Sequence, residues 1–330
     1  MVTLGVIGCG HWGPNHIRNF NSLPNSNVKS CADLDEKRLD QIRIMYPNIN
    51  TTSDFMDILN DEEINAVVVS TPTNTHYKIA KSALEKGKDV LCEKPLTINI
   101  EESEELVEIS NKLNRILMVG HVFLFNAGIQ KLRELIKENE LGKIYYVHCT
   151  RTNLGPIRED VNSVYDLASH EIYICGYLLN SEPDKIIAKG EDFLQPGIED
   201  LAFISMSYPG KTLVNIHVSW LDPIKVRKIT VVGDLRMAIW NDMDTLEPVR
   251  IFNKGVTKEP YYTDYGEFHY LTRDGDIHSP KIRLIEPLKN QAMHFIDCVE
   301  NRKKPLSDGD NGLNVVKILN KIQASLKQNK

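Results

Sequence analysis

The 330-residue sequence lacks several patterns that would define a function class. Its six cysteines include no C-x-x-C pair, which argues against both a disulfide framework and a zinc site, so we expect no metal. The net charge is −6, and there is no block of about five or more lysines and arginines, which argues against a nucleic-acid-binding surface. There is no run of about eighteen apolar residues and no basic amino-terminal region followed by an apolar core. These absences predict a cytoplasmic protein that binds neither nucleic acid nor membrane.

The first part of the chain alternates short apolar runs with helical patterns. Apolar residues make up 42% of the sequence, and a chain of this length is expected to form two domains. Uninterrupted apolar runs are typical of parallel strands that are covered on both faces. We therefore predict an α/β fold whose first domain, residues 1–122, is a doubly wound parallel sheet. The strands are expected at 3–7, 28–32, 66–70, 89–92 and 116–119, and the helices at 14–23, 35–45, 53–59 (capped by Ser53), 75–85 and 100–113.

Beyond Phe123 the pattern changes to longer segments in which apolar and polar residues alternate. Such segments predict a second domain, residues 123–330, with a large, mainly antiparallel sheet that has one open face. An open face needs cover, so we expect a homodimer or homotetramer formed through this sheet. Of two C-terminal helical patterns, 288–300 and 312–326, the first is expected to pack back on the first domain. Residues 253–280 lack periodicity and are predicted to form a loop region over a site or subunit contact.

A glycine-rich segment follows the first apolar run. In a strand–turn–helix unit, Gly8 allows a tight turn, Gly10 admits a pyrophosphate, and Gly13 lets the helix pack closely on the strand. Asp33 follows the next apolar run, where its carboxylate can accept hydrogen bonds from the adenosine ribose and repel a 2′-phosphate. The pattern predicts NAD as cofactor, in preference to NADP. The alternative is an ordinary glycine-rich turn with a solvated Asp33.

Lys94 is the first candidate for catalysis. Ligands of a doubly wound sheet lie at the carboxyl ends of its strands, where segments 8–13, 70–76 and 93–95 are expected to converge. A lysine there can hydrogen-bond a substrate hydroxyl and stabilise the alkoxide that forms as hydride leaves. The alternative is a surface lysine before a proline.

Asp166 and His170 form the second candidate group. Four positions apart on a predicted helix over 164–179, they are expected on one face, about 6 Å apart. Asp166 would orient His170 and favour its protonated form, which suits a general base acting on a hydroxyl. An ordinary surface pair is the alternative, and a zinc site is less favoured because no third ligand has suitable spacing.

The chain resembles the Gfo/Idh/MocA oxidoreductases over nearly its whole length. Four segments carry the resemblance, in this order along the sequence: Gly8-Cys9-Gly10-His11-Trp12-Gly13, Thr71-Pro72…His76, Glu93-Lys94-Pro95 and Asp166…His170. The resemblance implies a Rossmann domain joined to an α/β domain with an open sheet, often assembled as dimers or tetramers. It implies that Lys94, Asp166 and His170 are catalytic, that His170 is the general base, and that hydride passes from a sugar or polyol carbon to NAD. The cofactor contacts are expected at Gly8, Gly10, His11, Trp12, Gly13, Asp33, Ser70, Thr71, Pro72, His76, Glu93, Lys94 and His121.

Two departures from the family pattern concern the substrate. Asn162-Ser163 stand where many relatives have glycines, and Tyr173 stands where they have an aspartate. Segments 153–162, 219–223 and 286–288 instead resemble the branch that oxidises nucleotide-activated amino sugars at C3, such as UDP-N-acetylglucosamine 3-dehydrogenases and UDP-N-acetylglucosaminuronate oxidases.

For such a substrate, two arginines are expected to grip a diphosphate and the other polar groups to contact the sugar. The expected substrate-binding residues are Lys94, Asn126, Arg151, Asn153, Arg158 and His170. Four alternatives remain: both arginines in solvated loop pairs, a ketoreductase of a nucleotide deoxysugar, a dehydrogenase of a free sugar or polyol, and a non-catalytic NAD-binding sensor.

Overall fold

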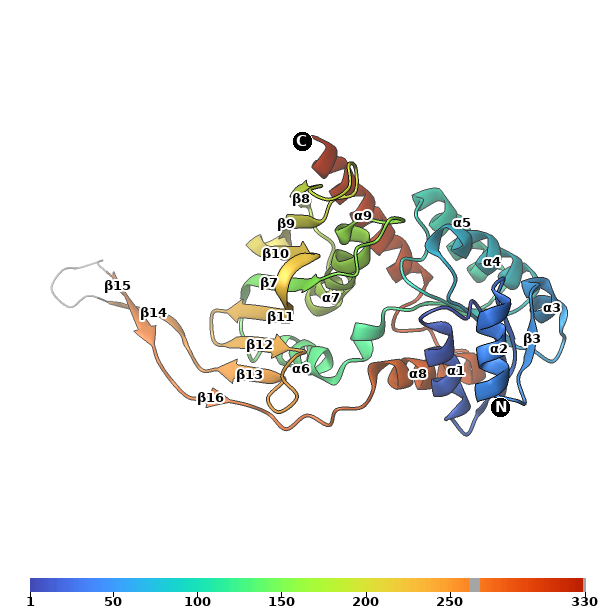
Figure 1. The fold of residues 1–330 in the computed structure, drawn as a ribbon. Coiled ribbons are helices and arrows are strands. Elements are labelled where there is room, and N and C mark those ends of the chain that lie inside the picture. The colour runs from blue at the N-terminus through green and yellow to red at the C-terminus, as the bar shows by residue number, and fades with distance from the viewer. Residues whose placement is uncertain (261–267, 329–330) are drawn as a thin grey trace. The chain divides into compact units, whose positions relative to one another are not determined.

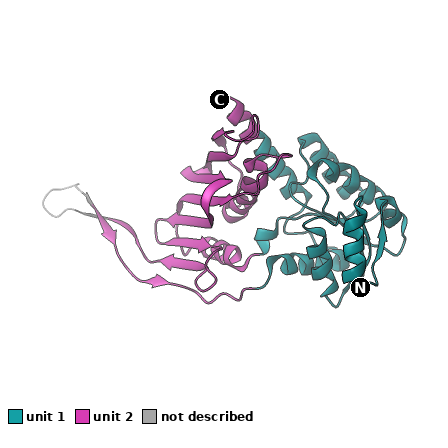
Figure 2. Ribbon diagram, in the orientation of Figure 1, with its two compact units in different colours: residues 1–125, 285–320 teal, residues 126–284, 321–330 magenta. Residues whose placement is uncertain are grey.

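The computed structural model describes residues 1–260 and 268–328 and divides into two compact units (Figure 2). The first unit comprises residues 1–125 and 285–320, and the second comprises residues 126–284 and 321–330. The expected domains were 1–122 and 123–330. The structure differs in that the chain returns to the first unit at residue 285, before its last two helices.

The first unit contains a six-stranded, fully parallel sheet (Figure 1). Its strands are β1 (Val2–Ile7), β2 (Ser26–Ala32), β3 (Asn50–Thr52), β4 (Ala66–Val69), β5 (Asp89–Cys92) and β6 (Leu117–Val119). The spatial order is β3-β2-β1-β4-β5-β6. Successive strands are thus added on one side of β1 up to β3 and on its other side from β4 onward. This confirms the predicted doubly wound sheet. A reversal of this kind leaves a crevice outside the carboxyl ends of the strands, where ligands bind.

Two helices of the first unit begin directly after an aspartate cap. The Asp35 carboxylate accepts from the Lys37 N–H, and the Asp54 carboxylate accepts from the Met56 N–H, so Asp54 caps the third helix in place of the expected Ser53. The helices are α1 (Gly13–Asn21), α2 (Glu36–Met45), α3 (Phe55–Asn60), α4 (Thr73–Glu85), α5 (Ile100–Lys112), the 3₁₀ turn η1 (Val122–Phe125), α8 (Pro287–Asn301) and α9 (Gly309–Gln328).

Helix α8 packs on α1 within the first unit. The rings of Phe20 and Phe295 meet edge to face, with centroids 6.2 Å apart, and Arg18 donates two hydrogen bonds to Glu286, at 2.5 and 3.0 Å. The helix expected at 288–300 therefore lies against the first helix of the chain. This packing explains why residues 285–320 belong to the first unit.

The second unit is built on an eight-stranded sheet, in the order β16-β13-β12-β11-β7-β10-β9-β8. Every neighbouring pair is antiparallel except β7 and β10. The strands are β7 (Ile144–Leu154), β8 (Lys185–Glu191), β9 (Leu201–Tyr208), β10 (Thr212–Ser219), β11 (Leu221–Gly233), β12 (Met237–Asn241), β13 (Val249–Phe252) and β16 (Ile277–His278). The predicted large, mainly antiparallel sheet is confirmed.

One face of this sheet is buried under helices α6 (Ala127–Lys137) and α7 (Ser169–Leu179). On β9, Ala202, Ile204 and Met206 are buried, while Phe203 between them is 56% exposed. This alternation is expected for a sheet with one open face. The exposed side chains Tyr146, Ile187, Phe203 and Leu213 form what we call the outer face.

Residues 255–273 differ from the predicted loop. Strands β14 (Gly255–Pro260) and β15 (Phe268–Arg273) pair with each other in a separate antiparallel sheet, and β16 joins the edge of the large sheet. Residues 261–267 lie outside the described part of the chain. None of the helices in the described residues has the length and apolar character needed to cross a membrane.

Candidate functional site

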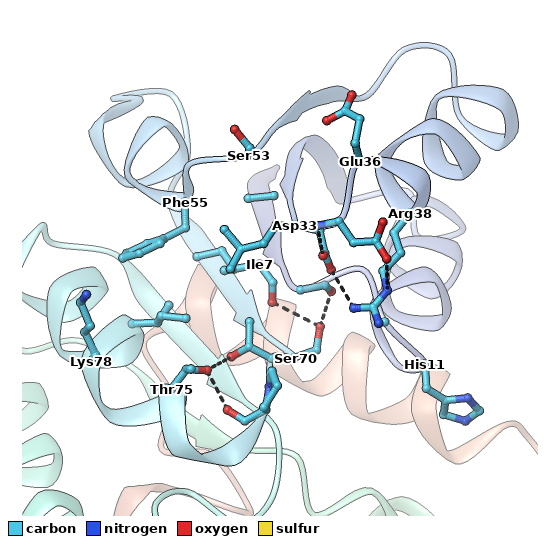
Figure 3. A pocket seen from close by; sticks show the side chains of 18 residues that line it. Ile7, His11, Asp33, Glu36, Arg38, Ser53, Phe55, Ser70, Thr75 and Lys78 are labelled. Carbon is cyan, nitrogen blue, oxygen red and sulfur yellow. Dashed lines mark hydrogen bonds and ion pairs between the residues drawn. The ribbon is translucent and has the colours of Figure 1, made fainter.

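A cavity of about 1080 Å³ lies in the first unit at the carboxyl ends of β1, β2 and β4 (Figure 3). Seven of the expected cofactor residues line it: Gly8, Gly10, His11, Asp33, Ser70, Thr71 and Pro72. Glu36, Arg38, Ser53, Phe55, Thr75, Lys78 and Ile79 are among the other lining residues. The cavity therefore combines the glycine-rich turn, the acid after β2 and the loop after β4, as a dinucleotide site requires.

The glycines of the turn are fixed by close backbone packing. Gly8 has φ +97°, and a Cβ there would lie 2.6 Å from the Ser70 carbonyl oxygen. A Cβ at Gly13 would lie 2.1 Å from the Gly8 carbonyl oxygen. At Gly10 the nearest atom to such a Cβ is Nη1 of Arg38, at 3.6 Å, so the backbone faces a flexible side chain. This is the arrangement that lets a pyrophosphate approach the chain.

The Asp33 carboxylate is held in place at the cavity. Its Oδ2 accepts from the Cys9 N–H at 2.6 Å, and its Oδ1 accepts from the Asp35 N–H at 2.8 Å. Arg38, which the sequence analysis missed, places Nη1 3.5 Å from Oδ2. The carboxylate is thus preorganised beside one cation, with acceptor capacity left for ribose hydroxyls.

His76 and His121 are buried and bind other parts of the protein. The His76 ring nitrogens lie 2.9 Å from the carbonyl oxygens of Thr71 and Pro95, so the ring joins two loops. His121 Nδ1 lies 2.6 Å from Asn311 Oδ1 at the start of α9. Burial lowers the pKa of His76 below its usual range and lowers the pKa of His121 to about 4. The His121 ring is therefore neutral near pH 7, and burial disfavours the charged form of His76, whose neutral ring can donate to one of the two carbonyls. Both rings connect loops at the site.

Glu93 and Lys94 directly follow β5. Glu93 Oε1 lies 2.8 Å from Nε2 of His16, and Glu93 Oε2 accepts from the Lys94 N–H at 3.3 Å. Burial by itself raises the pKa of the Glu93 carboxyl. The hydrogen bond from His16 and the charges of His16 and Lys94 outweigh this effect, so the pKa lies below its usual value. Glu93 therefore fixes the backbone at Lys94, whose side chain is partly exposed.

His16 is a residue that the sequence analysis missed. It lies on α1 three positions after Gly13, and its buried side chain connects this helix to the Glu93 loop. The sequence could have predicted this, because a residue three positions after the inward-facing Gly13 lies on the same face of the helix. Trp12, at the position before α1, is 39% exposed and meets His11 edge to face, with centroids 5.2 Å apart.

In the second unit, Asp166 lies in a π-helical turn, η2 (Val164–Ala168), directly before α7. The regular helix expected here is therefore wrong at this turn, because residues of a π-turn are spaced for i→i+5 bonds. The Asp166 carboxylate accepts from Arg158 Nη1 at 3.2 Å and from Trp220 Nε1 at 3.1 Å. His170 Nδ1 lies 2.8 Å from the Tyr173 hydroxyl, a contact that the sequence analysis did not predict.

The expected diphosphate grip by Arg151 is not supported. Its side chain is 2% exposed, and its guanidinium is paired with the buried Glu171 carboxylate. Strand parity explains the difference, because on β7 Arg151 points to the same buried face as Val147 and Cys149.

Of the other expected substrate residues, Asn153 lies near the end of β7, Arg158 in the loop after it, and Asn126 directly before α6. Arg158 is 36% exposed and pairs with Asp160 through Nη2 at 2.6 Å as well as with Asp166. The Asn153 amide donates to the Gly155 carbonyl. Asn126 Oδ1 caps α6 by accepting from the Gly128 N–H at 2.9 Å, and Asn126 Nδ2 donates to Asp242.

Within residues 1–260 and 268–328, no three His, Cys, Asp or Glu side chains are grouped in a way that could hold a metal ion.

Both units match family models. Residues 2–121 match the oxidoreductase family with an NAD-binding Rossmann fold, and residues 129–239 match the GFO/IDH/MocA C-terminal domain. A curated relative, myo-inositol 2-dehydrogenase from Thermotoga maritima, is 25% identical over 94% of this chain and 92% of its own length.

Two solved structures have the same fold. UDP-N-acetylglucosamine 3-dehydrogenase GnnA from Acidithiobacillus ferrooxidans aligns with a TM-score of 0.84 and 21% identity, over 99% of this chain and 98% of that chain. GenD2 from gentamicin A biosynthesis, in complex with NAD, aligns with a TM-score of 0.83 and 19% identity, over 100% of this chain and 95% of that one. With a family model matching each of its two units, this chain belongs to the Gfo/Idh/MocA family and is an NAD-dependent oxidoreductase that acts on CH–OH groups.

Proposed function

We propose that this enzyme oxidises a ring hydroxyl, at C3, of a nucleotide-activated amino sugar such as UDP-N-acetylglucosamine. The observation that carries the proposal is Arg158, a partly exposed guanidinium whose hydrogen bond to Asp166 places a positive charge next to a proposed catalytic residue. Such a charge suits a substrate with a diphosphate more than a neutral polyol. The name of the structurally similar GnnA, a UDP-N-acetylglucosamine 3-dehydrogenase, supports the same substrate class.

We assign binding of the cofactor to the cavity of the first unit. The amides of the 8–13 turn bind the pyrophosphate, and the Asp33 carboxylate binds the adenosine ribose. When bound, NAD supplies the oxidising power by accepting a hydride from the substrate carbon.

The proposed chemistry of the chain itself is general base catalysis by His170. With Nδ1 beside Tyr173, its Nε2 takes the proton of the substrate hydroxyl while the carbon loses hydride. The Lys94 ammonium hydrogen-bonds the same oxygen and stabilises its negative charge until the ketone forms. Asp166 restrains Arg158 and adds a negative charge that favours the imidazolium formed on His170.

The test is a substrate panel with NAD, following reduced nicotinamide by its absorbance. We expect UDP-N-acetylglucosamine or its uronate to give a higher kcat/KM than myo-inositol. Arg158→Gln should raise KM for the nucleotide sugar about tenfold or more and leave KM for inositol nearly unchanged, because it removes a charge-assisted contact to phosphate.

Two results would contradict this proposal. If inositol is the better substrate, as the name of the curated relative suggests, the chain is a polyol dehydrogenase. If reduced cofactor and a keto-deoxysugar nucleotide react faster than any alcohol, it is a ketoreductase. Lys211→Gln, a change at an exposed turn far along the chain from Arg158, serves as the charge-matched control.

We further propose that a second copy of the chain covers the outer face of the large sheet. Leu213 and Tyr146 are cross-strand neighbours on this face, and Phe203 stacks on His217 with ring centroids 4.5 Å apart. Exposed apolar and aromatic side chains gathered on one sheet surface indicate a protein interface. The assembly is expected to be a dimer or a tetramer.

Phe203→Glu should therefore lower the molar mass measured by light scattering after size-exclusion chromatography, because it places a charge at the centre of an apolar contact. Ile44→Glu, at an exposed position on α2 in the first unit, is the control and should leave the mass unchanged. A wild-type protein that is already monomeric at micromolar concentration would refute the interface.

A further inference from the structure

We propose that Tyr173 is a positioning residue for His170, holding the Nδ1 atom so that Nε2 faces the substrate. The inference rests on the proposed role of His170 as the general base. It assigns a role to a residue that the catalytic group expected from the sequence does not include, at a position where this chain departs from the family pattern.

The contact is local and well defined. The Tyr173 hydroxyl lies 2.8 Å from His170 Nδ1, and the two rings meet edge to face, with centroids 5.6 Å apart and planes at 79°. Both residues lie on α7, three positions apart, which places them on the same side of the helix. Tyr173 is 1% exposed, so its side chain is anchored in the interior while its hydroxyl reaches the imidazole. One helix therefore carries both members of the pair.

A phenol suits a histidine that changes protonation state in each reaction. When Nδ1 carries the proton, the Nδ1–H group donates a hydrogen bond to the Tyr173 oxygen, and the Nε2 lone pair is available as a base. After Nε2 takes the substrate proton, the same Nδ1–H···O bond persists. In the other neutral tautomer the Tyr173 hydroxyl donates to Nδ1, and the ring keeps its position. The imidazole can therefore take up and release a proton at Nε2 without rotating.

The phenol also differs from a carboxylate in charge. A carboxylate at position 173 would favour the imidazolium and raise the pKa of the base, whereas a neutral phenol adds no such charge. Asp166 lies on the π-turn that directly precedes α7, and it pairs with Arg158. A new charge at residue 173 would act on His170 directly, because the side chain at this position contacts Nδ1.

The test compares Tyr173→Phe with Tyr177→Phe. Tyr177 lies on the same helix, about two turns after His170, and is partly exposed, with its ring under the Arg133 guanidinium. Its variant therefore removes a hydroxyl from the same helix at a residue other than the partner of His170. We expect Tyr173→Phe to keep the melting temperature and NAD affinity but to lower kcat about tenfold, because the base loses its fixed orientation. Tyr177→Phe should retain wild-type kcat.

The pH profile gives a readout that a purely structural role would not change. Tyr173→Asp should recover part of the turnover and move the acid limb of kcat/KM to higher pH by about one unit, since it restores an acceptor but adds a negative charge. If this variant fails to fold, Tyr173→Phe decides alone through its kcat at unchanged stability.

Two outcomes separate the inference from the function on which it rests. An inactive His170→Ala together with Tyr173→Phe at wild-type kcat and pH profile would overturn the role of Tyr173 and leave His170 as the base. A His170→Ala variant with wild-type turnover would overturn the proposed base, and the role of Tyr173 with it.

Discussion

Replacing Lys94 by alanine is expected to lower kcat by about a hundred- to a thousandfold while NAD binding remains within a factor of a few. Residues 8–13, Asp33 and the loop after β4 line the cofactor cavity, so the variant leaves them in place. The lost ammonium would have stabilised an oxygen that becomes negative as the carbon loses hydride, and groups of this kind contribute mainly to the chemical step. Single-turnover kinetics and NAD titration by protein fluorescence measure the two effects separately.

The control for this variant is Lys86→Ala, which removes an exposed lysine directly after α4 in the same unit. Lys94→Arg retains the charge with different geometry and should recover only part of the rate. Equal losses of kcat and NAD affinity would contradict a catalytic role. Unchanged biological function of Lys94→Ala in the producing cell would instead favour a protein that senses NAD without turning over substrate.

The sequence predicts the first unit well because its signals are local. Short, mainly apolar runs bounded by turn residues are typical of strands that are buried on both faces, and the strands β1, β4 and β5 are almost entirely buried. Gly8 and Gly13 lie at contacts where a Cβ has no space. A glycine at each of these positions therefore predicts close backbone packing. The parallel strands and the glycine turn together account for the cavity. In a doubly wound sheet, a ligand-binding crevice forms where the order of the strands reverses.

The second unit is harder to predict because residue type does not show which of its ion pairs are buried. The Arg151–Glu171 and Arg158–Asp166 pairs cannot be told apart by composition, yet one is buried and the other is partly exposed. The burial of Arg151 could have been predicted, because in the alternation along β7 it shares a face with Val147 and Cys149. The π-turn at Asp166 could not, because it inserts a residue into a pattern that otherwise fits a regular helix.

Replacing Asp33 by serine is expected to reverse the cofactor preference from NAD toward NADP. The Asp33 carboxylate disfavours a 2′-phosphate through its negative charge, and it also pairs with Arg38, whose Nη1 lies 3.5 Å away. Arg38 is 49% exposed and lines the cavity, so without the carboxylate its guanidinium is available to pair with a phosphate. The ratio of kcat/KM for NADP to that for NAD should rise about a hundredfold or more, as two charge-dependent contacts change together.

Two companion variants identify the physical cause of this switch. Asp33→Asn removes the charge but keeps an acceptor for the Cys9 N–H, so it should retain the turn and gain NADP activity with less loss of NAD activity. Asp33→Ser combined with Arg38→Ala should lose most of the NADP gain, because repulsion is relieved without a cation to replace it. If the wild-type enzyme already uses both cofactors equally, Asp33 does not discriminate between them. In that case the hydrogen bonds from the Cys9 and Asp35 N–H groups to its carboxylate stabilise the turn. Asp33→Ser would then lower activity with both cofactors to the same extent.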